Sequence, residues 1–588
     1  MASASKMPEE VRGIVRRYRN AFVTVAILSA ILNFLVLGGS LYMMLIYDSV
    51  LPSHSLPTLF GLLALLVGVY AFQGIFDALR SRILADVGSS FDRAMSHRVQ
   101  HAMFDSALMG AHSEDSVGPM RDLENIRTFL TGPGPATLID LPWILFFIGI
   151  LMMIQIWTGL TALIGGALLV GLTIVTNRVT KGPMARLGML TAYRNAQAQS
   201  NVRHIEILTA LGMRGRMLDR WQQMNDVYLS SQRTIGKSLA TLGGISKIGR
   251  MLLQSLILTV GAIMVIRGEA SGGAIFASSI LSGRALAPVD QAIGNWRSLA
   301  AARIGWQRLC ALLQHVPPRP DIRTILPKPS RELSVEQLYI APPGGTRMTV
   351  QGANFAMKAG DGLAIIGPSA AGKSSLGRAL IGIWKPARGA VRLDGASLDQ
   401  WPGDLLGESI GYLPQTVELL EGTVAENIAR FEAEPRSEDV IAAATAAGVH
   451  DMIIALPQGY ETPVGPDGRE LSAGQQQRIG LARALYRDPF LVMLDEPNSN
   501  LDAVGDAALE RAIGSVRARG GIVIVIAHRP SALTNINLVM VMRDGRVEAF
   551  GPRDEVLQKI VSRPVPIRAG QTQGGSDAAG PAAAAGGF

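Results

Sequence analysis

The sequence predicts a multi-domain membrane protein, in which an all-α transmembrane domain of six helices is followed by an α/β domain of the P-loop class. Long runs without a charged residue fill much of the first half of the 588 residues, and a phosphate-loop pattern follows an apolar strand in the second half. Hydrophobic residues make up 48% of the chain and charged residues only 17%, which also favours a membrane protein. This length exceeds what a single core usually holds, so at least two domains are expected.

The first segment, residues 1–20, is a polar and basic tail. The apolar run after it is too long for a signal peptide and lacks a small-residue cleavage site, so we expect an uncleaved membrane anchor.

Residues 21–315 are predicted to form the transmembrane domain. A span needs about 20 apolar residues, so the charge-free stretch 141–177, with about 37 residues, is divided near 155–159. At the start of this stretch, Asp140 is expected to cap a helix and Trp143 to lie at the membrane interface. The six predicted spans are 21–47, 57–76, the two parts of 141–177, 251–266 and the shorter, Gly- and Ser-rich segment 270–282.

Basic residues indicate the orientation of these spans. They crowd into the N-terminal tail and into segments 77–134 and 178–250, whereas Arg267 is the only Lys or Arg in the three hairpin turns. By the positive-inside rule the tail, both segments and the second domain are cytoplasmic. Apolar positions at helical spacing in residues 192–223 predict that long helices continue out of the membrane.

The composition also excludes some classes of function. The formal charge of +8 is explained by basic faces that meet anionic membrane lipids, and no nucleic-acid-binding motif is present, so nucleic acid is not an expected partner. Cys310 is the only cysteine, which excludes an intrachain disulfide and any cysteine-based zinc or iron–sulfur cluster. We expect Cys310 to be a small buried residue.

A proline-rich linker, residues 316–331, separates the two domains, because prolines stop the helical pattern there. In the predicted nucleotide-binding domain, residues 332–566, apolar strands alternate with helical segments, as in an α/β domain with a largely parallel sheet. Residues 567–588 form a Gly- and Ala-rich tail that is expected to be disordered. The clearest predicted strands are 362–366, 490–494 and 522–526.

The run 367–374, Gly-Pro-Ser-Ala-Ala-Gly-Lys-Ser, matches G-x-x-x-x-G-K-[ST] between a strand and a helical segment. Its glycines let main-chain N–H groups point at phosphates, and the start of the helix adds positive potential. Lys373 is expected to reach the β and γ phosphates, and Ser374 to ligate Mg²⁺. The predicted nucleotide-binding residues here are Gly367, Pro368, Ser369, Ala370, Ala371, Gly372, Lys373, Ser374 and Ser375.

A second buried strand, 490–494, ends in Asp495 and Glu496 at the carboxyl edge of the predicted sheet. Asp495 is expected to hold Mg²⁺, directly or through water. Glu496 is placed to polarise the attacking water, so the pair divides metal binding from general-base catalysis.

The run 471–475, Leu-Ser-Ala-Gly-Gln, opens a helical segment in which Ser472 is the expected N-cap and free N–H groups offer an anion site. Together with the phosphate loop and the strand that ends in Asp-Glu, it resembles the LSGGQ signature of ABC ATPases. The resemblance implies that Ser472, Gly474 and Gln475 bind nucleotide. Ala473 replaces the usual first glycine and Gln476 a frequent arginine, yet activity is expected.

The same resemblance implies further roles. Gln415 resembles the Q-loop residue that contacts Mg²⁺ and water, and it is expected to take part in both metal binding and catalysis. Residues 499–502 resemble the D-loop, and His528, after a strand, resembles the switch histidine that contacts the γ phosphate. The position of the aromatic residue that stacks on adenine falls near Pro342, and Tyr339 lies nearby in the sequence.

In ABC ATPases two nucleotide domains close head to tail, and each ATP lies between one phosphate loop and the other signature helix. One chain here carries one set of motifs, so a homodimer with two equivalent sites and with ATP and Mg²⁺ as cofactors is implied. Hydrolysis would then return the spans from an outward-facing to an inward-facing arrangement.

Several stretches are similar to the type I secretion ABC exporters of the alkaline-protease and haemophore kind: 42–48 with Pro52 and Ser53, 140–143, 391–395 and 496–502. Members of that group are bacterial inner-membrane proteins. They export unfolded polypeptides with C-terminal signals, such as proteases or RTX-like proteins, through a periplasmic adaptor (membrane fusion) protein and an outer-membrane channel. The similarity implies the same function and the same partners here, without leader cleavage, since only a short tail precedes the first span.

Two alternatives stay open from the sequence. An exporter of lipids or small amphiphilic molecules would share every nucleotide motif and differ only in the spans. A membrane-anchored regulatory ATPase would move nothing, which transport by reconstituted vesicles would test.

Overall fold

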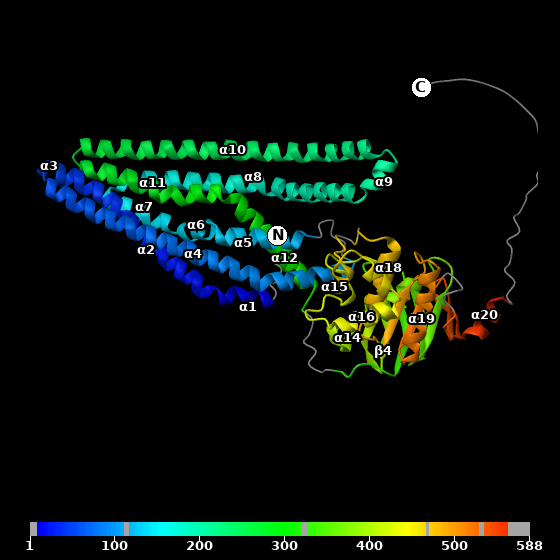
Figure 1. Ribbon diagram of the computed structural model, residues 1–588. Helices are drawn as coiled ribbons and strands as arrows, with labels where there is room; N and C mark the ends of the chain where they lie inside the picture. The colour runs from blue at the N-terminus through cyan, green and yellow to red at the C-terminus, as the bar shows by residue number, and fades with distance from the viewer. Residues whose placement is uncertain are drawn as a thin grey trace, which may run out of the picture. The chain divides into compact units, whose positions relative to one another are not determined.

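The computed structural model describes residues 9–110, 117–318, 326–465, 468, 470–527 and 534–561. The chain divides into two compact units, a helical unit at Met1–Arg319 and a nucleotide unit at Pro320–Phe588. The helical unit runs from blue to green in Figure 1, and the nucleotide unit from green to red.

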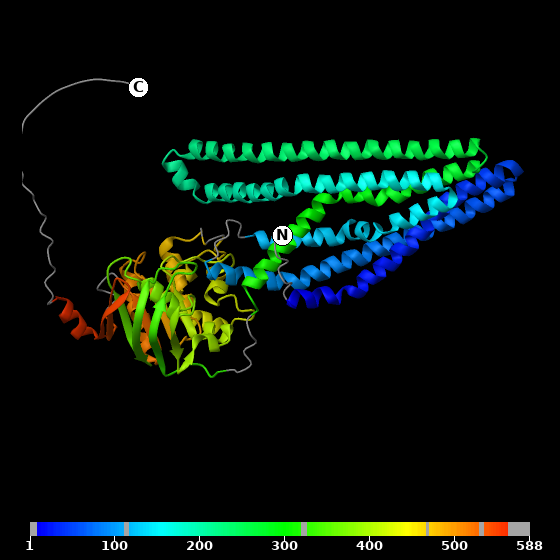
Figure 2. The same ribbon diagram turned by 180° about the vertical axis from the view of Figure 1, so that it is seen from behind.

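The helical unit is built from long helices. Its elements are α1 (Glu9–Arg17), α2 (Arg19–Leu45), a π-helical turn (Ile46–Val50), α3 (Leu51–Ser53), α4 (Leu56–Leu108), α5 (Gly118–Thr131), α6 (Gly134–Asp140), α7 (Trp143–Ile154), α8 (Ile156–Arg203), α9 (Ile205–Ala210), α10 (Arg214–Ile266), α11 (Gly272–Gly294) and α12 (Trp296–His315). As expected, α4, α8 and α10 extend far beyond the apolar runs. The helices α8 and α10 lie side by side (Figure 1, Figure 2).

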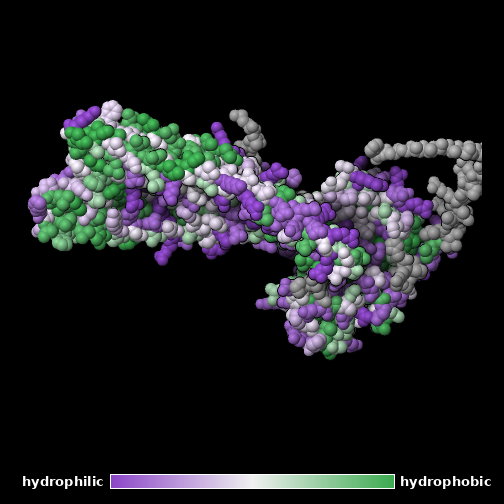
Figure 3. All heavy atoms as spheres, turned by 90° about the horizontal axis from the view of Figure 1, so that it is seen from above, coloured by the Kyte–Doolittle hydropathy of each residue, from purple (hydrophilic) through white to green (hydrophobic). Residues whose placement is uncertain are grey.

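Among the described residues, four helical stretches are long and apolar enough to cross a membrane, or five if the bent pair α6 and α7 counts as one span. The four are Arg19–Ser53, α4, α8 and α10. The sixth predicted span lies in α11, which is not among them, and it stays a prediction. Figure 3 shows hydrophobic residues, in green, over much of one end of the helical unit. Leu65 of α4, Leu145 of α7 and Leu168 of α8 are exposed, as expected for side chains that face lipid.

The N-terminal tail contains a docked helix. Val11 of α1 is buried in a cluster with side chains of α4 and α12, among them Val99 and Leu313. Arg98 of α4 donates to the Glu10 carboxylate at 2.9 Å. The amphipathic helix α1 therefore packs against protein along one face.

Asp140 does not cap a helix, so that prediction is wrong. It is the last residue of α6, and its carboxylate accepts hydrogen bonds from Arg80 of α4 at 3.0 Å and from Asn33 of α2 at 3.1 Å. The N-cap position of α7 falls on Pro142 instead. The ion pair and the amide thus join three helices where the chain bends by 41° between α6 and α7. Such pairing is the usual condition for a charged side chain near the membrane interior.

The nucleotide unit contains two sheets. A six-stranded sheet has the order β10-β9-β3-β8-β7-β6, and a four-stranded antiparallel sheet has the order β2-β1-β4-β5. The strands are β1 (Glu332–Ile340), β2 (Val350–Lys358), β3 (Gly362–Ile366), β4 (Arg388–Leu393), β5 (Ala396–Ser397), β6 (Ile410–Leu413), β7 (Leu491–Asp495), β8 (Ile522–Ile526), β9 (Leu538–Arg543) and β10 (Arg546–Pro552). Five of the six strands in the larger sheet, β9 to β6 in this order, pair in parallel.

The described part of the nucleotide unit also contains eight helices. They are α13 (Lys373–Leu380), α14 (Gly403–Ser409), α15 (Val424–Ile428), α16 (Ser437–Ala446), α17 (His450–Ile454), α18 (Ala473–Leu485), α19 (Ala503–Ala518) and α20 (Arg553–Val561), with 3₁₀ turns at Leu398–Gln400 and Gly459–Glu461.

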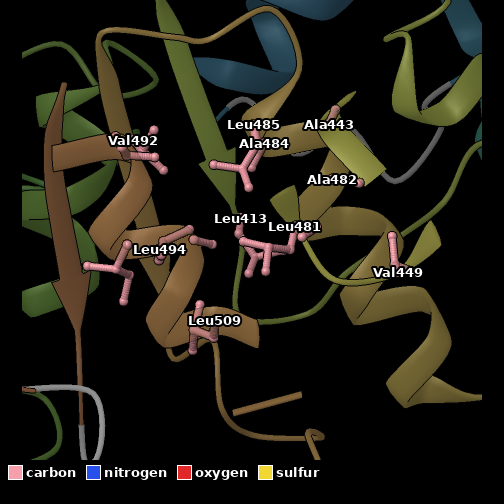
Figure 4. Close-up of a cluster of buried hydrophobic side chains, with 14 of the residues drawn as sticks. Leu413, Ala443, Val449, Leu481, Ala482, Ala484, Leu485, Val492, Leu494 and Leu509 are labelled. Atoms are coloured by element: carbon pink, nitrogen blue, oxygen red, sulfur yellow. The ribbon is translucent and has the colours of Figure 1, made fainter. Parts of the chain in front are cut away.

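Both faces of the parallel strands are buried. In β7, Val492 and Leu494 belong to one apolar cluster, whereas Leu491 and Met493 belong to another on the opposite face. Figure 4 shows the first cluster, in which Leu494 lies near Leu413, Leu481 and Leu509 from the surrounding elements. Successive residues of a strand point to opposite faces, so a continuous apolar run is the pattern expected for a strand covered on both sides.

Candidate nucleotide site

The order of the sheet brings the two predicted motifs to one edge. β3 and β7 flank β8 on either side and run parallel to it. The loop that begins at Gly367 follows β3, and Glu496 follows β7. Both segments therefore leave the sheet at the same, carboxyl edge, where α/β sheets bind their ligands.

The phosphate loop has a shape that needs its glycines. Gly367 has a φ of 151° and Gly372 a φ of 94°. A Cβ at Gly372 would collide with the carbonyl oxygen of Thr349, and one at Gly367 with that of Met542. The loop enters α13 directly at Lys373, so the first N–H groups of that helix are available to an anion. These features fit a phosphate group.

Lys373 lies across the phosphate loop. Its ammonium donates to the carbonyl oxygens of Gly367 at 2.8 Å and Pro368 at 2.9 Å. The side chain is buried, and this burial lowers the pKa of Lys373, while Glu496 and Asp495 act in the opposite direction. Asp495 and Glu496 thus lie close enough to the Lys373 ammonium to act on its charge.

Ser374 and Asp495 present oxygen atoms to each other. The Ser374 hydroxyl donates to Asp495 Oδ1 at 3.4 Å. Asp495 is buried, and burial raises its pKa, which the hydrogen bond from Ser374 partly offsets. A hydroxyl and a buried carboxylate are hard oxygen ligands, so this pair fits Mg²⁺.

Glu496 and Gln415 are joined in this structure. The Gln415 amide Nε2 donates to Glu496 Oε2 at 3.0 Å. Glu496 has a φ of 50°, in the left-handed region, and its N–H donates to the carbonyl of Ile526 at 3.0 Å. A non-glycine residue with this φ is strained, which is common at catalytic positions. The predicted contact of Gln415 with Mg²⁺ stays a prediction.

The signature segment begins α18. Ser472 is the N-cap, as predicted: its hydroxyl accepts from the Gln475 N–H at 3.3 Å, and the Gln475 side chain accepts from the Ser472 N–H at 2.8 Å. Ser472 is exposed, and Gly474 lies against the Asn500 carbonyl, which would be 3.1 Å from an added Cβ. The side chain of Gln475 therefore acts in capping here, and its contact with nucleotide stays a prediction.

Gln477 makes buried long-range contacts beside the predicted site, which sequence reasoning missed. Its side chain is buried, donates to the Pro497 carbonyl and to Ser499 Oγ, and accepts from the Asn500 N–H at 3.1 Å. It thereby links Pro497, and Ser499 and Asn500 of the predicted D-loop, to helix α18. The only signal in the sequence was a third glutamine in a row at a helix start, which does not reveal a long-range contact.

Three further predicted positions are His528, Tyr339 and Pro342. His528 lies outside the described residues, so its role stays a prediction. Tyr339 lies in β1, where the guanidinium of Arg388 approaches its ring to 6.0 Å. Pro342 begins a turn closed by the Gly345 N–H at 2.8 Å. Stacking of adenine on a residue of this region stays a prediction.

Two family models match the chain: the ABC transporter model over residues 350–499 and the ABC transporter transmembrane region over residues 22–288. The type I secretion system ATP-binding protein PrsD of Rhizobium meliloti (strain 1021) is 48% identical over 95% of this chain and 96% of its own length. The leukotoxin translocation ATP-binding protein LktB of Mannheimia glucosida is 29% identical, over 92% of this chain and 77% of its own. The exotoxin translocation ATP-binding protein PaxB of Pasteurella aerogenes is 28% identical, over 92% and 76%.

Among solved structures, a bacterial Atm1-family ABC exporter with ATP bound superposes with a TM-score of 0.77. The superposition covers 92% of this chain and 96% of that one at 23% identity, which is a likeness of fold.

Proposed function

The chain belongs to the ABC transporter family as a type I secretion ABC exporter, and from this we propose that it uses ATP to drive unfolded polypeptides with C-terminal signals across the inner membrane of a bacterium. The observation that carries the proposal is the similarity to PrsD over nearly the whole of both chains, membrane unit and nucleotide unit together. The basic tail and basic cytoplasmic segments support an orientation with the nucleotide unit in the cytoplasm.

The residues at the carboxyl edge of the sheet have different roles in ATP hydrolysis. The loop 367–375 and Lys373 bind the phosphates of ATP, and Glu496 polarises the attacking water. Ser374, Asp495 and Gln415 hold Mg²⁺, which neutralises charge on the phosphates when it is bound. His528 contacts the γ phosphate. The shared carboxyl edge of β3 and β7 supports this arrangement.

The working form is a homodimer in which Ser472 and Gly474 of one copy close the phosphate loop of the other. Ser472 is exposed at the start of α18, which supports this role. A second feature is the helical tip, which we define as Val202, Ile205, Ile207 and Leu211 around α9. These side chains are 72%, 45%, 55% and 64% exposed within one chain. Apolar side chains gathered at a cytoplasmic turn favour burial against another protein surface.

Leu211→Asp tests the helical tip. We expect secretion to fall by about tenfold or more, because the introduced carboxylate weakens docking of the helical tip. The ATP turnover of the purified protein should change by less than about threefold, because the substitution does not affect the phosphate-binding residues. Met189→Asp is the matched control, since Met189 is 65% exposed on α8 outside the tip. Equal secretion by the two variants would show that the tip is not a docking surface.

Secretion through a periplasmic adaptor protein and an outer-membrane channel can be tested in the host. Deletion of the gene, or Glu496→Gln in its place, is expected to retain proteins with C-terminal signals inside the cell. A host that still secretes them would rule out the proposed function. Stimulation of ATP hydrolysis by lipids or small amphiphiles, with no response to a secretion-signal peptide, would favour the alternative exporter.

A further inference from the structure

Arg430 lies just after α15 and contacts three other parts of the nucleotide unit. Its guanidinium donates to the carbonyl oxygens of Arg483 at 3.0 Å and Ala484 at 3.3 Å, both near the end of α18. It also donates to Gly407 in α14 at 2.7 Å and to Ile410 at the start of β6 at 3.1 Å. None of these four acceptors is a carboxylate, so the side chain connects main-chain segments directly.

The charge of Arg430 suits this position. Burial lowers the pKa of the guanidinium, and the neighbouring Arg483 lowers it further, but an arginine remains charged at neutral pH. The last carbonyls of a helix carry the negative end of its dipole, and a cation placed there is stabilising. The helix concerned is α18, which begins next to the signature Ser472.

The main chain of Arg430 is also unusual. Its φ is 55°, in the left-handed region that a non-glycine residue seldom adopts. The preceding helix turn is fixed by Asn427, which is fully buried, donates to the Leu420 carbonyl at 2.8 Å and accepts from the Leu420 N–H at 2.9 Å. The segment from Gln415 to Arg430 is therefore stabilised by hydrogen bonds within itself. Arg430 in turn links this segment to α18.

The segment around Gln415 packs on α18 as well. Arg483 donates to the Glu418 carbonyl at 3.1 Å. Gly480 packs against Val417, and a Cβ added at Gly480 would lie 2.8 Å from the Val417 side chain. The end of α18 thus contacts the chain on the far side of Gln415.

The near side of Gln415 makes a comparable contact. A Cβ at Gly411, in β6, would collide with the Ala484 carbonyl, which also accepts from Arg430. Gln415 is the second residue after β6 and donates to Glu496. Both arms of the loop that carries Gln415 are therefore held against the end of α18.

We propose that Arg430 is a positioning residue for ATP hydrolysis, which holds the signature helix α18 and the loop of Gln415 as one rigid body. Gln415 then meets Glu496 only when the whole of α18, including Ser472 at its start, is in place. This inference rests on the hydrolytic roles proposed above for Glu496 and Gln415. It adds a residue that touches neither nucleotide nor metal.

Arg430→Met and Arg430→Lys in the purified full-length protein test the proposal. We expect kcat for ATP to fall roughly tenfold in Arg430→Met while KM changes less than about twofold, because the phosphate loop is not altered. Lysine should restore little, since one ammonium cannot span four carbonyls as the planar guanidinium does. The control is Arg436→Met, because Arg436 is an exposed residue of the same segment whose ion pair is with Asp439.

A double variant separates positioning from a general loss of structure. If Arg430 acts through Gln415, Arg430→Met with Gln415→Ala should have the same kcat as the slower single variant, within about twofold. Additive losses, or a kcat for Arg430→Met within about twofold of the wild type, would overturn the proposal. So would a loss of ATP binding and of cooperative thermal unfolding in Arg430→Met. Failure of the proposed function is distinguishable, because it would show in secretion or in undiminished hydrolysis by Glu496→Gln.

Discussion

Glu496→Gln is expected to leave ATP binding intact and to lower ATP turnover by about 10²–10⁴-fold, the range typical for loss of a general base. The substituted amide keeps the size of the side chain and still offers an oxygen to the Gln415 amide, which now donates to Glu496 at 3.0 Å. It cannot accept a proton from water. Single-turnover hydrolysis and nucleotide binding in the purified protein measure the two effects separately.

The same variant should accumulate an ATP-bound closed dimer, because binding proceeds while hydrolysis does not. Size-exclusion chromatography or cross-linking after addition of MgATP detects this form. Glu421→Gln is the matched control, since Glu421 is exposed and lies outside the carboxyl edge of the sheet. Turnover of Glu496→Gln within about tenfold of the wild type would mean that another group acts as the base.

A mixed dimer is expected to show that each nucleotide site is shared between two chains. Lys373→Ala is placed on one chain and Ser472→Arg on the other. If each site joins the phosphate loop of one chain to the signature of its partner, one composite site carries both changes and the other carries neither. About half of the wild-type turnover should remain if the two sites act independently.

The matched control places both substitutions on one chain and pairs it with an unaltered chain. The composition of the dimer is the same, but each shared site now contains one defect, so little turnover is expected. Sites contained within single chains predict the reverse: activity in the control and none in the mixed dimer. ATP hydrolysis by the two purified dimers, separated by different affinity tags, therefore decides between the arrangements.

Much of the nucleotide site could be predicted because its signals are local. The strands 362–366 and 522–526 lie where predicted, and the strand that ends at Asp495 begins one residue later than predicted. Apolar runs of this length identify strands covered on both faces, and the loop pattern specifies its own shape through glycines. The N-cap at Ser472 was predictable for the same reason, since capping involves residues only three apart.

The membrane part was predictable in outline but not in its contacts. Charge-free runs located the long helices, because the hydrocarbon core demands apolar side chains over a fixed length. The partners of Asp140 lie 60 and 107 positions away in the chain, and no local pattern indicates which of several polar residues a carboxylate will meet. A helix cap depends on residues adjacent in the chain, whereas the partners of Asp140 are distant in it.

The sequence by itself thus determined the phosphate loop, the acids that follow a buried strand and the presence of membrane helices, since each depends on periodicity or on spacing along the chain. The tertiary structure alone decided that Asp140 pairs with Arg80, that Gln477 holds the D-loop and that Arg430 binds the end of α18. These are polar groups whose partners are brought near only by the packing of distant segments. The contribution of these contacts to stability depends on how far each polar group is removed from water. The sequence around a single residue does not show this burial.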